Sequence, residues 1–185
     1  MTAEHDLTPT QREMDGRDWS FGGTWPYDPR WLFTDGVRIH YVDEGPCDGA
    51  PVVLLHGAPY WAYAFRTEIA ERVAAGERAI AYDQLGFGRS DKPLRESEYS
   101  LERDVAHLRA LLDELGLAAV ALVAQGSSAP IARAFRASEP ERVARLEERE
   151  EPPPPDLLRA PLLGRLLVKA ARLDIRRAPL GEDER

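Results

Sequence analysis

Apolar and polar residues follow two different patterns along the first third of the chain. From Val37 to Val42 an apolar residue stands at every second position, which predicts a strand with one face in the core. From Val52 to Leu55 every residue is apolar, as in parallel strands that are covered on both faces. We therefore expect the first strand near an edge of a sheet and the second near its centre.

Strands then alternate with helices. Helical spacing of apolar residues predicts helices over residues 63–74, 101–115 and 127–137, and short apolar segments predict strands over 78–82 and 118–124. Gly116 ends the second helix and Pro140 follows the third. Because this alternation is typical of parallel sheets with right-handed crossovers, the predicted fold class is α/β, a mostly parallel sheet with flanking helices.

The two ends of the chain depart from this alternation. Residues 1–20 are polar and aperiodic, so we expect a disordered or frayed start before a partial core at 21–146. Residues 147–156 are rich in glutamate and proline and predict a charged linker, because neither suits a buried strand. Residues 157–177 place leucines at helical spacing and predict an amphipathic helical segment, followed by a tail at 178–185.

Composition excludes several classes of partner. The chain has 185 residues, 43% of them hydrophobic, which suffices for one domain with a sizeable core. Asp and Glu number 32 against 24 for Lys and Arg, and the net charge of -8 argues against nucleic acid, because phosphate binding needs a basic face. No apolar run approaches the roughly 20 residues that span a bilayer, so we expect neither membrane insertion nor secretion.

Cysteine and histidine usage narrows the chemistry further. Cys47 is the only cysteine, which excludes an internal disulfide and is typical of a protein in the reducing cytoplasm. No spacing of Cys and His is typical of a metal site, and we expect neither a metal nor a cofactor. The four histidines are His5, His40, His56 and His107.

Three segments carry a family resemblance. Tyr41 to Gly45, His56 to Tyr63 and Asp83 to Pro93, followed by the turn at 123–131, are similar in order and spacing to the haloalkane dehalogenase-like branch of the α/β-hydrolase fold. The resemblance covers roughly residues 30–146. It implies hydrolysis of a small organic substrate, a chain truncated relative to the family, and a segment at 157–177 that opens a helical cap.

The turn at 123–131 resembles the elbow that holds the nucleophile of this family. Positions two before and two after the nucleophile must be small, so that strand and helix can pack closely. With Gly126 at the centre these flanks are Ala124 and Ser128, whereas centring the turn on Ser127 makes the bulky Gln125 a flank. Gly126 therefore takes the nucleophile position, and glycine has no side chain that could attack.

The resemblance also assigns roles around the turn. The backbone N–H groups of Ala58 and Ser127 are expected to form the oxyanion loop, where they face developing negative charge. Family members carry an aspartate and then a halide-binding tryptophan where this chain has Gly126 and Ser127. The residues expected to shape the site without reacting are His56, Gly57 and Asp83.

These features predict an α/β-hydrolase family protein that is catalytically impaired or inactive. No histidine follows the turn, although the triad order of this fold places the base last. One alternative is a serine hydrolase that uses Ser127 or Ser128 as its nucleophile. Another is a noncatalytic interaction module or homo-oligomer that associates through an incomplete sheet edge and the apolar 157–177 segment.

Overall fold

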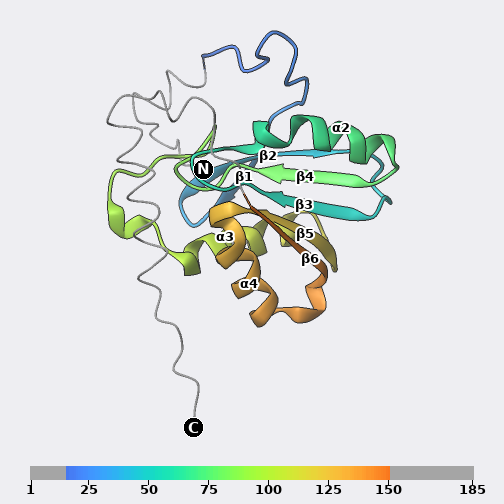
Figure 1. Ribbon diagram of the computed structural model, residues 1–185. Coiled ribbons are helices and arrows are strands. Elements are labelled where there is room, and N and C mark those ends of the chain that lie inside the picture. Colours follow the sequence, from blue (N-terminus) through green and yellow to red (C-terminus); the bar gives the residue numbers. More distant parts are fainter. Residues whose placement is uncertain (1–15, 151–185) are drawn as a thin grey trace, which may run out of the picture.

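A computed structural model describes residues 16–150 of the chain, so the segments predicted at 157–177 and 178–185 lie outside the described residues. Within residues 16–150, six strands form one sheet in the order β1-β2-β4-β3-β5-β6 (Figure 1). The strands are β1 Arg30–Thr34, β2 Val37–Glu44, β3 Pro51–Leu55, β4 Arg78–Tyr82, β5 Val120–Gln125 and β6 Val143–Arg149. Strands β3, β4, β5 and β6 run parallel to one another, whereas β2 pairs antiparallel with both β1 and β4, so the predicted mostly parallel sheet is confirmed.

Helices cover both faces of the sheet. One face is covered by α2, and α3 and α4 lie on the other (Figure 1). The helices are α2 Arg66–Ala74, α3 Leu101–Glu114 and α4 Ala129–Ser138, with short 3-10 turns η1 Ala62–Phe65, η2 Glu96–Glu98, η3 Gly126–Ser128 and η4 Pro140–Arg142. None of the helices within residues 16–150 combines the length and the apolar character needed to cross a bilayer.

The apolar run of β3 supplies both halves of the core. Val53 and Leu55 point to the side of α3 and α4, and Val52 and Leu54 point to the side of α2. All four side chains are at most 1% exposed. Because successive strand residues face opposite sides, only a strand with helices on both faces needs such an unbroken run. The predicted central position of this strand is confirmed.

Strand β1 is missing from the elements that the sequence predicts. Leu32 is its one buried residue, and Phe33 is 69% exposed, so the strand shows no period of two. It forms the end of the sheet beside β2. An edge strand with a single core residue cannot be recognised from the spacing of apolar residues.

Strand β6 runs to Arg149, whereas the sequence places the end of the core at residue 146. No further strand pairs with β6 among the described residues, so its side chains do not all need to be apolar. The charges at its end are paired instead, Glu147 with Arg149 at 2.6 Å and Glu148 with Arg133. Charged residues are tolerated here because, within residues 16–150, the strand lies at the edge of the sheet.

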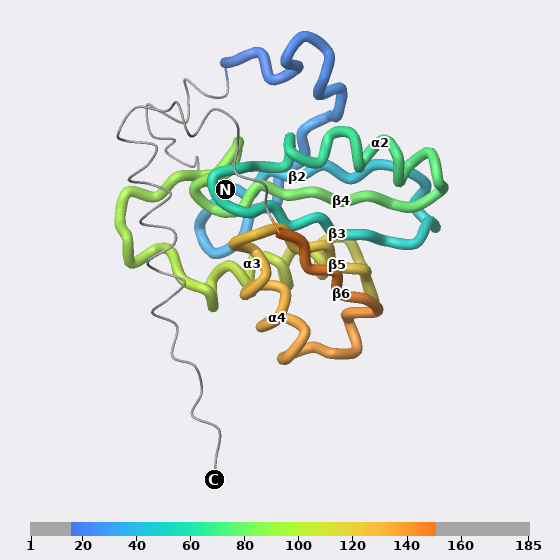
Figure 2. The backbone as a smooth tube through the Cα atoms, viewed as in Figure 1, coloured from blue at the N-terminus to red at the C-terminus, as the bar shows by residue number. Residues whose placement is uncertain are grey.

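Order also begins before residue 21, where the sequence analysis places the start of the core. The ring of Trp19 packs edge-on against Phe21 at 6.0 Å and against Trp61 at 5.5 Å between centroids. Figure 2 shows this N-terminal segment looping outside the sheet, beyond α2, before it enters β1. These contacts fix Trp19 at a position that its polar neighbours do not predict.

Candidate functional site

Three connections meet at the carboxyl ends of β4, β3 and β5. They are the loop that begins at His56, the loop that begins at Asp83, and the turn at Gly126. Because these three strands are parallel neighbours in the sheet, the loops that follow them lie at the same edge. Ligands of open α/β sheets bind in the crevice outside this edge.

Gly126 adopts the conformation expected at the centre of the turn. Its φ of +56° lies in the left-handed region, between the extended Gln125 and the first turn of helix. Residues that hold a nucleophile at such an elbow are strained in a similar way. Glycine reaches this conformation without strain, so the turn forms here with no side chain at its centre.

Ser128 is the structural anchor of the turn. Its buried hydroxyl oxygen accepts a hydrogen bond from the Gln125 N–H at 3.0 Å. Its proton faces the carbonyl oxygen of Leu55 at 2.8 Å and that of Gln125 at 3.0 Å. A hydroxyl with these hydrogen bonds fixes the turn after β5 against β3.

Ser127 lies in a different environment. Its half-buried hydroxyl oxygen accepts a hydrogen bond of 2.6 Å from the backbone N–H of Ala58. The structure thus brings together the two residues that the sequence analysis assigns to the oxyanion loop. The Ala58 N–H, however, already has an acceptor within the protein.

The imidazole of His56 has no free nitrogen. Its Nε2 accepts a hydrogen bond of 2.9 Å from the Gln84 backbone N–H, so the ring proton is on Nδ1, which faces the Gly57 carbonyl at 3.2 Å. The Gln84 side-chain amide donates to the carbonyl oxygen of His56. Burial lowers the pKa of His56 in spite of the nearby Asp83 carboxylate. A neutral ring with both nitrogens engaged is not available as a general base.

Asp83 organises the loop that follows β4. Its carboxylate accepts hydrogen bonds of 2.8 Å from the backbone N–H groups of Ala62 and Arg89 and from Nδ1 of His40. Burial alone would raise the pKa of this carboxyl, but the bonds from His40 and Arg89 hold it below its usual range. Ionised Asp83 therefore joins β2, η1 and the 83–93 loop, which is a structural task.

His40 is the residue of this region that sequence reasoning misses. Its polar position in the alternating strand predicts a partly exposed side chain, but the structure buries it completely. The ring packs edge-on against Trp31 at 5.3 Å between centroids and donates to Asp83. Its strand, β2, is separated from β5 by β4 and β3, so His40 does not lie beside the elbow.

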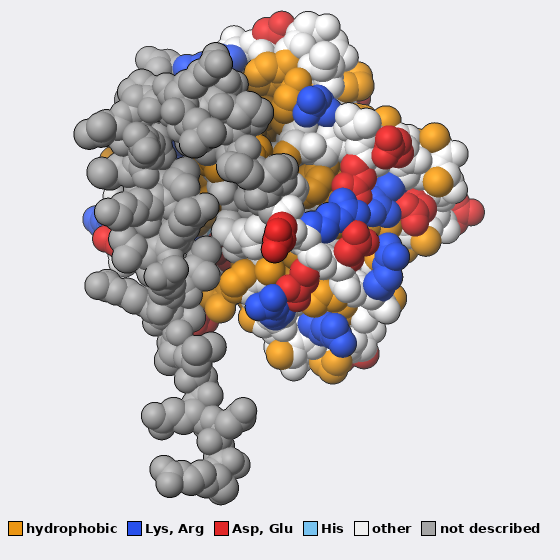
Figure 3. All heavy atoms as spheres, in the orientation of Figure 1, with side chains coloured by type: hydrophobic (Ala, Val, Ile, Leu, Met, Phe, Trp, Pro, Cys, Tyr) orange, Lys and Arg blue, Asp and Glu red, His pale blue; other side chains and the backbone are white. Residues whose placement is uncertain are grey.

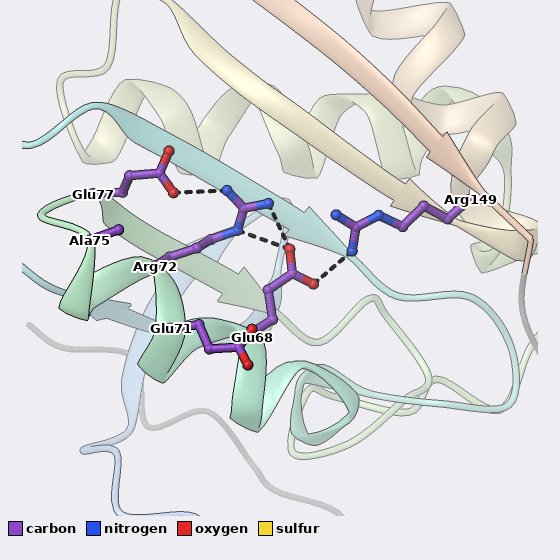
Figure 4. Close-up of a pocket in the computed structure, with 6 residues that line it drawn as sticks. All are labelled: Glu68, Glu71, Arg72, Ala75, Glu77 and Arg149. Carbon is purple, nitrogen blue, oxygen red and sulfur yellow. Dashed lines mark hydrogen bonds and ion pairs between the residues drawn. The ribbon is translucent and has the colours of Figure 1, made fainter.

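A hollow of about 360 Å³ lies between α2 and the end of β6. Its lining residues are Glu68, Glu71, Arg72, Ala75, Glu77 and Arg149 (Figure 4). Arg72 bridges Glu68 at 2.6 Å and Glu77 at 2.9 Å, and Arg149 reaches Glu68 at 2.8 Å. These ion pairs join α2 to the end of β6, and the hollow has no excess of unpaired positive or negative side chains among Glu68, Arg72, Glu77 and Arg149.

The pairs extend into what we call the charge ladder. Its members, in contact order, are Arg145, Glu147, Arg149, Glu68, Arg72 and Glu77. Acidic and basic side chains are interspersed over this face of the molecule (Figure 3). No group of three or more His, Cys, Asp or Glu side chains within residues 16–150 is arranged to hold a metal ion.

The fold and the turn together define a class of protein. A parallel sheet with helices on both faces and a tight strand-to-helix turn at Gly126 is the framework of α/β-hydrolase-like proteins. This chain belongs to the α/β-hydrolase fold family, whose model, described as alpha/beta hydrolase fold, matches residues 50–147.

Within this family, the chain is similar to individual haloalkane dehalogenases. The chain is 46% identical over 113 residues to a haloalkane dehalogenase of Mycolicibacterium paratuberculosis, a match that covers 61% of this chain and 38% of the relative. It is 40% identical over 144 residues to a haloalkane dehalogenase of Psychrobacter cryohalolentis, which covers 75% of this chain and 46% of the relative. The chain thus spans less than half the length of these two relatives.

Solved structures of haloalkane dehalogenases and epoxide hydrolases are also similar to this chain. A haloalkane dehalogenase from Paraglaciecola agarilytica, described as tetrameric, superposes with a TM-score of 0.64 at 31% identity over 73% of this chain and 46% of that chain. Epoxide hydrolase A from Mycobacterium thermoresistibile superposes with a TM-score of 0.63 at 32% identity over 78% of this chain and 44% of that chain. The resemblance to the dehalogenase-like branch is confirmed.

Proposed function

We propose that this chain presents the ligand-binding crevice of a haloalkane dehalogenase-like hydrolase for a small organic molecule, and that it is catalytically impaired. The observation that carries the proposal is Gly126. The residue adopts the elbow conformation, with a φ of +56°, but offers no atom that could attack a substrate.

The other candidate groups support this proposal. The polar side-chain atoms of Ser128 and His56 are hydrogen-bonded to backbone groups, and His40 is buried with a hydrogen bond to Asp83. In triad enzymes, loss of the nucleophile or the base lowers turnover on the order of 10^6-fold and leaves about 10^3 to 10^4 over water. We expect hydrolysis by this chain to be correspondingly slow.

Two assays test the proposal. Halide release from short chloroalkanes and bromoalkanes, and diol formation from small epoxides, should both stay below one turnover per chain. The variant Gly126→Asp restores the carboxylate, and we expect at most one alkyl adduct per chain, seen by intact mass. Gly126→Asn is the matched control, because an amide cannot form the ester. Multiple turnovers by the unaltered chain or by Gly126→Asp would contradict the proposal.

A serine hydrolase is a second candidate, favoured by the half-buried hydroxyl of Ser127 at the crevice. If Ser127 were a nucleophile, a fluorophosphonate probe followed by peptide mass spectrometry would label Ser127 stoichiometrically, and Ser127→Ala would abolish the label. We expect no adduct, because no imidazole within residues 16–150 is bonded to this hydroxyl.

Self-association is a third candidate, favoured by the open edge of β6 within the described part of the sheet. The Paraglaciecola agarilytica neighbour is described as tetrameric. Sedimentation velocity over a concentration series distinguishes a self-associating chain from a monomer. Growth in mass with concentration supports an interaction role, and a compact monomer throughout the series removes it.

A further inference from the structure

Strand β6 forms one end of the described sheet and leaves its outer side open there. Within residues 16–150 only β5 pairs with it, so the outer side presents a row of backbone N–H and C=O groups to a further strand. Strand β1 forms the other end of the sheet, but it has five residues, whereas β6 has seven. The longer edge offers more backbone hydrogen bonds to a partner.

The side chains of β6 alternate between the two faces of the sheet. Leu146 packs against the core on the side of α3 and α4. The residues Arg145, Glu147 and Arg149 face the side of α2, where Arg149 pairs with Glu68 at 2.8 Å. Charges of one sign would protect such an edge from pairing, but here positive and negative side chains alternate, so a second strand with the same sequence can neutralise them.

We propose that β6 pairs antiparallel with β6 of a second copy of this chain, in the register that places Leu146 on the two-fold axis. The proposal rests on self-association, the third candidate under the proposed function, and specifies the surface that carries it. In this register Arg145 of each copy lies opposite Glu147 of the other. Two opposite-charge pairs therefore flank the contact between the two leucines, and one sheet continues across both chains.

Symmetry excludes the neighbouring registers. A two-fold axis that relates antiparallel strands is perpendicular to the sheet, so opposite residues of the two copies belong to the same face. Centring the pair on Arg145, Glu147 or Glu148 would place two identical charges directly opposite each other, which destabilises the pairing. Among positions 145–148, only Leu146 puts an uncharged side chain on the axis.

Both charged residues remain available for this contact. The side chain of Arg145 is 60% exposed, and its nearest approach to Glu147 of its own chain is 3.8 Å, which is a weak pair. Glu147 binds Arg149 through Oε1 at 2.6 Å, and its Oε2 faces Arg145. The second carboxylate oxygen can therefore accept Arg145 of the other copy without loss of the pair to Arg149.

Sedimentation velocity of the 185-residue chain over a concentration series tests the register through charge reversal. The unaltered chain should form dimers and no larger species, because the two-fold contact is closed. Arg145→Glu brings two glutamates together at each pair, and Glu147→Arg brings two arginines together. Each variant alone should dimerise roughly 10- to 100-fold more weakly, since attraction is replaced by repulsion at two places.

An equimolar mixture of the two variants is the decisive sample. Each glutamate of one variant then lies opposite an arginine of the other, so the mixture should dimerise about as strongly as the unaltered chain. Misfolded variants could not restore association in this way. Urea denaturation at concentrations where the chain is monomeric shows separately that each variant folds.

Two control variants lie outside β6. Arg95→Glu makes the same change of charge at an exposed position before η2 and should dimerise as the unaltered chain does. Phe33→Ser removes a side chain that is 69% exposed on β1, at the other edge of the sheet, and should also leave the dimer intact.

The outcomes separate this proposal from the proposed function. A monomer at every concentration, a dimer that Arg145→Glu leaves unchanged, or a mixture of variants that stays monomeric would each overturn the pairing of β6. Loss of the dimer in Phe33→Ser would place the contact at β1 and overturn it as well. Multiple turnover of haloalkanes would contradict the proposed function without changing the sedimentation result.

Discussion

The hydroxyl of Ser128 lies 2.8 Å from the carbonyl oxygen of Leu55 and connects the turn after β5 to the neighbouring strand β3. The same hydroxyl oxygen accepts the N–H of Gln125 at 3.0 Å. The turn is therefore stabilised by a side chain next to its centre, and its geometry does not require a side chain at Gly126.

This connection gives the first prediction, for Ser128→Ala. The substitution leaves the buried Leu55 carbonyl and Gln125 N–H without their hydroxyl partner, so we expect the free energy of unfolding to fall by about 1–3 kcal/mol. Ser127→Ala, whose hydroxyl is half-buried, should change it by less than about 1 kcal/mol. Urea denaturation followed by far-ultraviolet circular dichroism measures both. Equal losses in the two variants would show that Ser128 has no special role.

The second prediction concerns Gly88, which has a φ of +46°. A Cβ at this position would lie 2.2 Å from Oδ2 of Asp83, and that carboxylate is already held by three donors. We expect Gly88→Ala to lower the free energy of unfolding by roughly 3 kcal/mol, from backbone strain and displaced hydrogen bonds together.

Gly76 is the matched control for this substitution. Its φ is +81°, but a Cβ there would meet no atom within 4 Å. Gly76→Ala should therefore cost only the backbone strain, about 1–2 kcal/mol. If the two alanine variants are equally stable by urea denaturation, close packing of Gly88 on Asp83 is not what the position requires.

The third prediction is a pH dependence caused by Asp104 in α3. Burial raises the pKa of this half-buried carboxyl from 3.8 to about 7, although Arg103 acts to lower it. The folded chain therefore holds a proton that the unfolded chain releases between these values. Stability from this group is present in full below pH 4 and is lost as the pH rises through 7.

Asp104→Asn keeps the shape of the protonated side chain and removes the titration. The variant and the unaltered chain should have similar free energies of unfolding near pH 4. Near pH 8 the variant should be the more stable, by a difference on the order of 2 kcal/mol. Urea titrations at the two pH values measure this difference, and a gap that does not change with pH would refute the assignment.

The fourth prediction tests the charge ladder at Arg149. Arg149→Ala removes the pairs to Glu147 and Glu68, which are 2.6 and 2.8 Å long, and should cost about 0.5–1 kcal/mol at low salt. At 1 M salt the Debye length is about 3 Å, so most of this loss should disappear. Arg145→Ala is the control, because its 3.8 Å pair is exposed and should contribute nothing measurable.

Local patterns in the sequence were sufficient for the centre of the sheet. The bounds of β4 match the predicted 78–82, and α3 ends one residue before the predicted 115. These elements are covered by neighbours on a fixed face, so the spacing of their apolar residues reflects the packing directly. The glycine at the elbow could also be predicted, because the requirement for small flanks acts within five residues.

The features of the fold and the site that the sequence did not predict depend on partners that are distant in sequence. His40 is buried with a hydrogen bond to Asp83, which lies 43 positions away, and no local pattern contains that information. The contact of Ser127 with Ala58 spans 69 positions and is invisible for the same reason. The sequence analysis ends the core at residue 146, inside β6, because the glutamates that follow suggest a solvated linker, whereas an edge strand can be both paired and charged.

The cluster of aromatic rings around Trp61 has a spectroscopic consequence. Of the four tryptophans, Trp19 and Trp25 lie in the N-terminal segment with ring centroids 5.5 and 5.6 Å from that of Trp61, and Trp31 lies in β1. Indole emission therefore reports whether this segment is docked against Trp61. Loss of the emission signal before the far-ultraviolet signal would mean that the segment detaches while the sheet remains folded.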